Sequence, residues 1–155
     1  MSHEVTRIKQ LLASYCHRVD RGTPDEVAAL FAGDGILRPR FDGPYEVRGR
    51  AAVRGWFAHY NRRLRDNTRH LKHMISSIAI DVDGNSARSS CYLTVASVSN
   101  ADNRASLCFG TYTDRLIKAD DTWLFADRLI ETHFLVHGLD MIEKLPSLGY
   151  PGAAS

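Results

Sequence analysis

A change of hydrophobic period near Arg69 constrains the fold more than any other feature of this sequence. In most of the chain up to Leu64, apolar residues recur every three or four positions, the spacing that places them on one face of an α-helix. From Arg69 onward, apolar and polar residues tend to alternate, which is typical of half-buried β-strands. Helices first and strands afterwards predict an α+β fold, with the helices gathered on one face of a curved sheet.

Three amphipathic helices are expected, over residues 4–19, 24–31 and 50–64. Thr23 is a good N-cap for the second helix, and Glu26 completes a capping box with it. Pro24 fits the first helical position. The buried face of this helix should consist of Val27, Leu30 and Phe31.

The remaining elements are expected to be strands. A short strand over 36–41 contains Pro39, which favours a sheet edge or a bulge, and 45–48 is its expected return strand. Tight turns such as Asp83-Gly84-Asn85 separate four longer strands, so these should form an antiparallel meander. The four strands are predicted over 74–82, 87–98, 105–118 and 123–136. Residues 1–138 are expected to form one domain, followed by a partly flexible tail over 139–155 that is rich in proline and glycine.

Charge and cysteine content narrow the class of protein. The net charge of +2 does not suggest nucleic-acid binding, and the basic cluster from Arg62 to Lys72 lacks the interleaved aromatic residues of a single-strand binder. Three widely spaced cysteines form no CxxC pair and are read as small buried hydrophobes. No apolar run reaches the roughly 18 residues of a membrane span, and the N-terminus is polar. We therefore expect a cytoplasmic protein without nucleic-acid or membrane partners.

Three residues could carry proton-transfer chemistry. Tyr15 and Asp20 lie near the end of the first helix, which should pack across the sheet and meet His73. Histidine can accept a proton at neutral pH, a carboxylate can fix its tautomer, and a tyrosine can donate to a developing oxyanion. The alternative is structural, with Tyr15 in the core, Asp20 as a helix-end acceptor and His73 as a satisfied buried histidine.

The face on which His73 lies depends on the register of its strand. Strict alternation places His73 opposite the more apolar set that includes Ile78 and Ile80. A bulge near Ser76-Ser77 would shift the register and bring both sets to one face. We favour the bulge.

No metal or cofactor is expected. His70 and His73 cannot share one strand face, and His133 and His137 lie too far apart along a strand to bind one ion. No cysteine or acidic residue is placed to complete either pair, and the chain has no glycine-rich loop that would cradle a phosphate.

Four segments, taken in order over residues 8–130, resemble the SnoaL-like branch of the nuclear transport factor 2-like superfamily: IKQLLASYCHRVDRGTPDEVAALFAGDG, RGRAAVRGWF, HMISSIAIDVDGNSA and GTYTDRLIKADDTWLFADR. The resemblance implies a cone-shaped α+β barrel, with three helices on a strongly bent antiparallel sheet and a pocket inside. Tyr15, Asp20 and His73 are similar to the tyrosine, aspartate and histidine of scytalone dehydratase-like and bile-acid dehydratase-like enzymes. The fourth polar residue of such dehydratases would fall near Cys91 or Val95, which cannot replace it.

The sequence and the resemblance together predict a cofactor-independent lyase or isomerase of the dehydratase or cyclase type, with His73 as the base. Its substrate would be a hydrophobic cyclic carbonyl compound such as a polyketide, steroid or terpenoid. The candidate pocket residues are Phe31, Trp56, Phe57, Tyr60 and Arg128. The alternative is a non-catalytic small-molecule-binding or accessory subunit with the same fold.

A homo-oligomer, either a dimer or a trimer, is also expected. The outer face of the sheet would then carry an apolar patch larger than a monomer usually exposes. Candidate residues for this patch are Tyr92, Tyr112 and Trp123.

Overall fold

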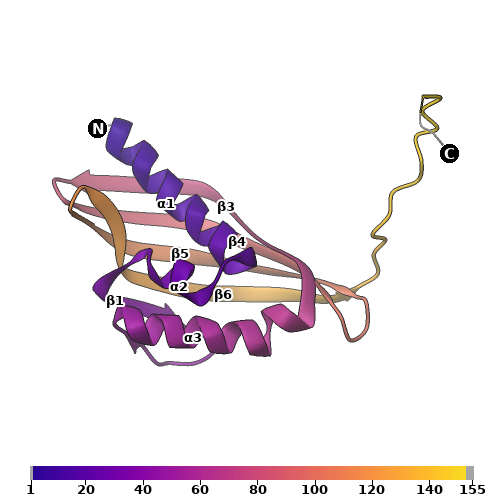
Figure 1. Ribbon diagram of the computed structural model, residues 1–155, viewed down its shortest axis with the longest axis horizontal. Coiled ribbons are helices and arrows are strands. Elements are labelled where there is room, and N and C mark those ends of the chain that lie inside the picture. The colour runs from indigo at the N-terminus through magenta and orange to yellow at the C-terminus, as the bar shows by residue number, and fades with distance from the viewer. Residues whose placement is uncertain (1, 153–155) are drawn as a thin grey trace.

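The computed structural model describes residues 2–152, which form three α-helices and a six-stranded sheet (Figure 1). The helices come first in the chain, except that two strands precede the third helix, so the predicted α+β class is confirmed. The elements are α1 (Ser2–Arg21), α2 (Pro24–Ala28), β1 (Phe31–Pro39), β2 (Val47–Arg48), α3 (Arg50–Arg63), a short 3₁₀ turn (Arg65–Asn67), β3 (Thr68–Asp83), β4 (Ser86–Ser99), β5 (Ala105–Ala119) and β6 (Thr122–Leu139).

The sheet is mixed and open. Its strand order is β2-β1-β6-β5-β4-β3, and β3 to β6 form the expected antiparallel meander. β1 instead pairs in parallel with β6, with Leu37 opposite Arg128, and β2 pairs antiparallel with β1. The sheet is therefore not wholly antiparallel, and β2 and β3 remain at opposite edges rather than closing a barrel.

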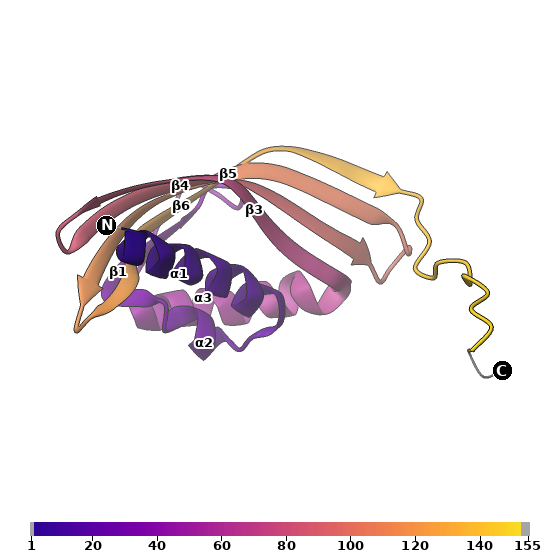
Figure 2. The same ribbon diagram turned by 90° about the horizontal axis from the view of Figure 1, so that it is seen from above.

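The sheet bends over the helices, which all lie on its concave side (Figure 2). The apolar stripe of α1 supplies much of the core, because its spacing turns one face of the helix toward the sheet. That stripe consists of Ile8, Leu12, Tyr15, Val19 and their neighbours Leu11 and Cys16, all buried.

The second helix is shorter than predicted. The capping box between Thr23 and Glu26 forms, but the helix ends at Ala28. The backbone then turns toward the sheet, where the Leu30 carbonyl accepts the Phe125 N–H at 2.9 Å. Phe31 is consequently the first residue of β1 rather than a helix residue, and its ring packs in the core against Phe125.

Two residues expected on the outer face lie on the inner one. Tyr112 and Trp123 are both buried, whereas Tyr92 is 62% exposed. Tyr112 alternates with outward-facing neighbours, and the indole N–H of Trp123 donates to Glu4 of α1. The helices therefore cover both aromatic side chains, and only Tyr92 belongs to the outer face.

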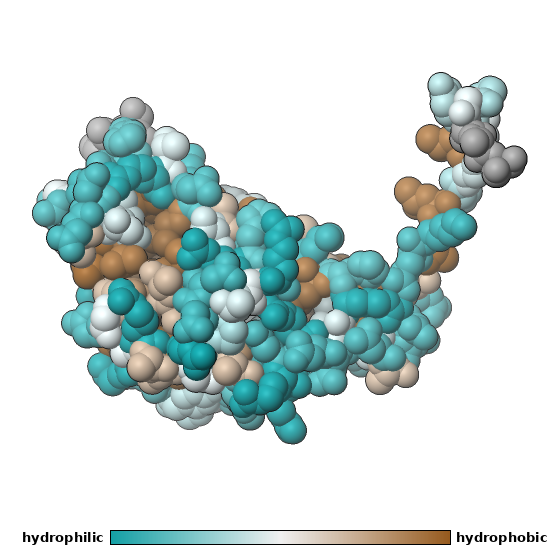
Figure 3. Space-filling model, in the orientation of Figure 1, coloured by the Kyte–Doolittle hydropathy of each residue, from teal (hydrophilic) through white to brown (hydrophobic). Residues whose placement is uncertain are grey.

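Residues 140–152 form no helix or strand and extend away from the body (Figure 1). Glu143 contacts Arg69, with the Arg69 Nε 2.9 Å from its Oε2, and Asp140 lies 3.2 Å from Arg104. Large apolar side chains on this tail are exposed and appear brown among hydrophilic residues in Figure 3. They are Ile142, Leu145 and Leu148, and the Tyr150 side chain is exposed as well. None of the helices within residues 2–152 combines the length and the apolar character needed to cross a membrane.

Candidate active site

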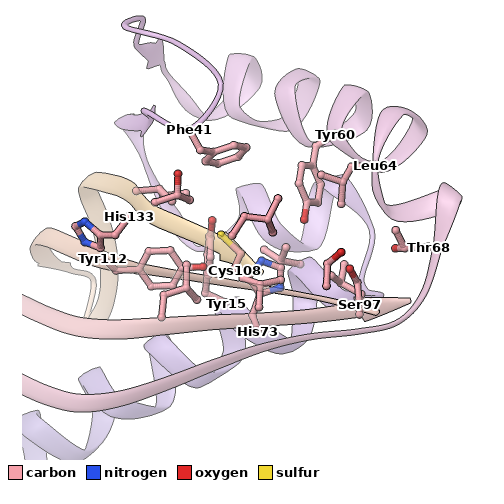
Figure 4. Close-up of a pocket in the computed structure, with 18 of the residues that line it drawn as sticks. Tyr15, Phe41, Tyr60, Leu64, Thr68, His73, Ser97, Cys108, Tyr112 and His133 are labelled. Atoms are coloured by element: carbon pink, nitrogen blue, oxygen red, sulfur yellow. The ribbon is translucent and has the colours of Figure 1, made fainter. Parts of the chain in front are cut away.

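A pocket of about 490 Å³ opens between the concave face of the sheet and the helices (Figure 4). One wall is aromatic and comes from α3, where the rings of Trp56 and Tyr60 stack and Phe57 packs edge-on against both. The sheet contributes Leu93 and Val95 from β4. Lys, Arg, Asp and Glu are absent from the described lining. The pocket thus suits an uncharged, mainly apolar molecule.

His73 and Asp20 meet at the sheet side of this pocket. The His73 Nδ1 lies 2.6 Å from the Asp20 Oδ1, and both side chains are largely buried, with 9% and 14% of their surface exposed. The carboxylate also accepts the backbone N–H of His73, at 3.1 and 3.0 Å to its two oxygens. Three contacts therefore hold the carboxylate and the imidazole in one geometry.

Local sequence explains why these two residues meet. The helix continues through Arg21, so Asp20 lies in its last turn and points to β3. In β3 the register shifts between Ser76 and Ala79, and Ser77 has a φ of 52°. The predicted bulge is thus present. It brings His73 to the same concave face as Ile78, which packs against the core.

The contact with Asp20 selects the tautomer of His73. An ionised carboxylate only accepts hydrogen bonds, so Nδ1 must carry the proton that points at Asp20. In a neutral imidazole, the other ring nitrogen, Nε2, then carries no proton. Because His73 lines the pocket, Nε2 is available there as a base.

Tyr15 lines the same pocket from α1. Its ring is enclosed by other aromatic rings, and no described residue hydrogen-bonds to its hydroxyl. Burial raises the pKa of Tyr15, and the nearby Arg128 guanidinium partly opposes that rise. Tyr15 therefore stays protonated at neutral pH and can donate to an oxygen of a bound molecule.

Two predicted pocket residues lie beneath the pocket instead. Phe31 is wholly buried in the core. Arg128 is also fully buried, where its Nε lies 2.8 Å from the Asp114 Oδ1 and its guanidinium stacks 4.1 Å from the Tyr15 ring centroid. Arg128 points inward because a register shift near Leu116 places it on the same face as Phe125.

Several pocket residues were not expected from the sequence. Most come from β3, β4, β5 and β6, whose inner faces could be identified only once the register was known. They include Thr68, Leu71, Ser97, Ser106 and Cys108, with Leu64 at the end of α3. Val95 pairs with His73 across the strands and also lines the pocket, so this position contributes no polar group.

The cysteines are poor nucleophiles. Burial raises the pKa of the Cys16 and Cys91 thiols to about 11, and it also raises the pKa of Cys108 in the pocket. At neutral pH these thiols carry little of the thiolate form that reacts. The cysteines are therefore weak candidates for nucleophilic chemistry in this pocket.

The remaining histidines have separate partners. His70 contacts Glu143 at 2.5 Å, His133 contacts the Thr111 hydroxyl at 3.0 Å, and His137 contacts Ser106. His70 and His73 thus point to different partners, as do His133 and His137. Within residues 2–152, no group of three or more His, Cys, Asp or Glu side chains is arranged to bind a metal ion.

Comparison with known proteins gives a match to one protein family. The sequence profile of the SnoaL-like domain matches residues 1–129. No curated protein matches the chain.

Solved structures share the fold. A protein of unknown function from Mycobacterium tuberculosis is 27% identical, with a TM-score of 0.74 over 84% of this chain and 72% of its own. A protein from Novosphingobium aromaticivorans, whose name suggests a scytalone dehydratase, is 22% identical with a TM-score of 0.74, over 92% and 95% of the two chains. A protein from Catenulispora acidiphila, solved in complex with S-DNPA, is 23% identical with a TM-score of 0.73, over 85% and 95%.

Proposed function

Because this chain belongs to the SnoaL-like domain family, we propose that it is a cofactor-independent lyase or isomerase of the dehydratase or cyclase type. Its substrate is a hydrophobic cyclic carbonyl compound, such as a polyketide, steroid or terpenoid. One observation carries the proposal. The His73 imidazole is held by Asp20 at 2.6 Å in the wall of an apolar pocket that reaches solvent.

The reaction begins with removal of a proton beside the carbonyl. The His73 Nε2 takes this proton, and the Asp20 carboxylate stabilises the imidazolium that results. Tyr15 donates a hydrogen bond to the enolate oxygen as negative charge develops there. In a dehydration, the enolate electron pair then expels a hydroxyl group, which leaves as water with the proton from His73. In an isomerisation, His73 returns the proton to another carbon.

The pocket supports this substrate class by its composition. A stacked pair of rings, Trp56 and Tyr60, forms a flat wall that suits a fused ring system. An ionised substrate would find no opposite charge on the described lining. The protein bound to S-DNPA shows that a relative with this fold takes a small organic molecule.

The proposal is tested by proton exchange on 2-tetralone, a bicyclic ketone with acidic protons beside its carbonyl. Incubation in D₂O followed by mass spectrometry measures deuterium incorporation. The wild-type protein should accelerate exchange, and His73→Ala should reduce the rate by about 10²–10⁴-fold, the usual contribution of general base catalysis. Asp20→Asn should reduce it less, and Tyr15→Phe should lower the rate more than the affinity.

The matched control is His59→Ala, which removes an exposed histidine from α3 and should leave the exchange rate unchanged. An exchange rate in His73→Ala equal to that of the wild type would exclude His73 as the base. Binding of 2-tetralone without any acceleration by the wild-type protein would favour a non-catalytic binding module.

The outer face of the sheet supports self-association. Cross-strand partners form one row over β3 to β6, running from Met74 through Thr94 and Phe109 to Phe134, which also borders the pocket. The last two rings stack at 4.7 Å, and the exposed Tyr92 lies beside the row on β4. We propose that this row, together with Tyr92, is the contact surface of a homodimer.

A further inference from the structure

Two sets of polar groups line different parts of the pocket. The first is the proton-transfer site at His73. The second consists of hydroxyl groups on β4 and β5, where Ser97 and Ser106 are direct cross-strand partners that both line the pocket. Direct partners in an antiparallel sheet have Cβ atoms about 5 Å apart, so one ligand atom can reach both hydroxyls. In Figure 4, Ser97 lies toward the end of the pocket that Thr68 borders.

The two hydroxyls differ in their availability. The Ser106 Oγ lies 2.9 Å from the His137 Nδ1, which fixes its position. No residue in the described part of the chain hydrogen-bonds to the Ser97 hydroxyl. Thr68 is less available as a donor, because its hydroxyl already donates to the Arg65 carbonyl at 3.0 Å. Ser97 therefore needs a partner from the solvent or from a ligand.

Strand register gives the separation of the two sets. His73 pairs with Val95, and Ser97 is two residues further along β4 on the same face. Two residues of a strand span roughly 7 Å. Ser106 is similarly two residues from Cys108, which is opposite Val95. Both serines are thus displaced from His73 by about 7 Å along the strand direction, and across the sheet by about 5 Å for Ser97 and about 10 Å for Ser106.

Apolar surface fills the distance between the two sets. Leu71 and Val95 form the sheet side, and Leu64 and the Tyr60 ring face them from α3 (Figure 4). Hydroxyl groups without a neighbouring cation favour a neutral hydroxyl or carbonyl over a carboxylate or phosphate. A ligand that satisfies both sets must carry two neutral polar groups at opposite ends of a rigid apolar body.

We propose that Ser97 and Ser106 form a distal subsite that binds a second, uncharged oxygen of the substrate. The substrate class is thereby narrowed to fused-ring compounds with a hydroxyl or carbonyl at the opposite end of the ring system from the carbonyl at His73. This inference rests on the proposed function for the orientation of the substrate, but the subsite itself is a binding property.

The test uses two probes that differ by one oxygen, 2-naphthol and 2,6-dihydroxynaphthalene. Their dissociation constants are measured by titration calorimetry. One neutral hydrogen bond contributes roughly 1 kcal/mol, so the wild-type protein should bind the dihydroxy probe about 5-fold more tightly. In the double variant Ser97→Ala/Ser106→Ala this preference should fall to about 1-fold, with little change for 2-naphthol.

The controls separate the subsite from folding. Ser90→Ala changes a serine of β4 outside this pocket and should keep the preference. Ser97→Ala breaks no described protein hydrogen bond. If the double variant has a lowered Tm, the probe affinities are therefore compared between the wild-type protein and this single variant.

Three results would overturn the subsite. They are equal affinity of the wild-type protein for both probes, no binding of either, and a preference that survives in the double variant. Failure of the proposed function would instead appear as unchanged 2-tetralone exchange in His73→Ala, whatever the naphthol affinities.

Discussion

At the scale of single residues, Arg128 and Asp114 form an ion pair without contact to solvent. The Asp114 carboxylate also accepts the Ser89 hydroxyl at 3.1 Å, and the guanidinium lies 3.9 Å from the Tyr112 ring centroid. One nitrogen of Arg128, Nη1, has no hydrogen-bond partner among the described residues. The Arg128 guanidinium packs against the Tyr15 ring on the side away from the pocket. The ion pair therefore supports a pocket residue without lining the pocket itself.

Removing one member of this pair should destabilise the protein strongly. Arg128→Met leaves the Asp114 carboxylate buried without its cation, and such changes typically cost about 3–5 kcal/mol. Urea unfolding should show this loss in the free energy of unfolding. Arg115→Met on the outer face, where the side chain is 61% exposed, is the control and should change stability by less than about 1 kcal/mol. A loss of less than about 1 kcal/mol in the free energy of unfolding of Arg128→Met would show that the ion pair is not needed for stability.

Residues whose structure depends on close neighbours in the chain were the ones that could be predicted. The capping box of Thr23 and Glu26 is local, so its hydrogen bonds follow from the sequence. The face on which Arg128 lies depends on a register shift in β6, which the alternation of residue types does not reveal. The same uncertainty concealed Ser97 and Ser106, because polar residues of a strand are usually read as solvent-facing.

At the scale of elements, the bulge in β3 decides which side chains face the pocket. Before the bulge the inward residues include His73 and Ile75, and after it they include Ile78 and Ile80. The mixed pattern of β3 was sufficient to predict the bulge, because strict alternation would expose the more apolar set. The parallel pairing of β1 was not predicted, since the choice of a distant partner strand leaves no local pattern.

Deleting Ser77 should therefore disrupt the site. Without the extra residue, one half of β3 must turn its side chains to the outer face, either His73 and Ile75 or the isoleucines that follow. We expect a loss of at least about 2 kcal/mol of stability from the exposed apolar surface, or loss of 2-tetralone exchange. Ser77→Gly is the matched control, because it keeps the bulge and suits the positive φ. Unchanged stability together with unchanged exchange in the deletion would contradict this role.

At the scale of the whole molecule, one side of the sheet is covered by helices and the other is not (Figure 2). The uncovered side carries the apolar row that ends in the stacked pair Phe109 and Phe134. A second copy of the chain could cover this row in the way that the helices cover the concave face. The tail presents further apolar side chains, but it extends away from the sheet.

The proposed dimer is tested by light scattering at micromolar concentration. The wild-type protein should show about twice the chain mass of 17.4 kDa. Met74→Lys/Tyr92→Lys places two charges on the outer face and should give the monomer mass. Tyr150→Lys changes an exposed aromatic residue of the tail and should keep the dimer. A wild-type mass near 17.4 kDa would exclude the dimer under these conditions.

The pairing of β1 with β6 also determines when the chain can fold during synthesis. Arg38 of β1 bonds to Asp127 of β6, and these residues are 89 positions apart. β1 leaves the ribosome early but cannot gain its parallel partner until the last strand has been translated. Until then, Phe31 and Leu37 lack the β6 side chains that bury them. The N-terminal segment that contains the helices therefore cannot complete its packing until the final strand is made, a delay expected of folds dominated by long-range contacts.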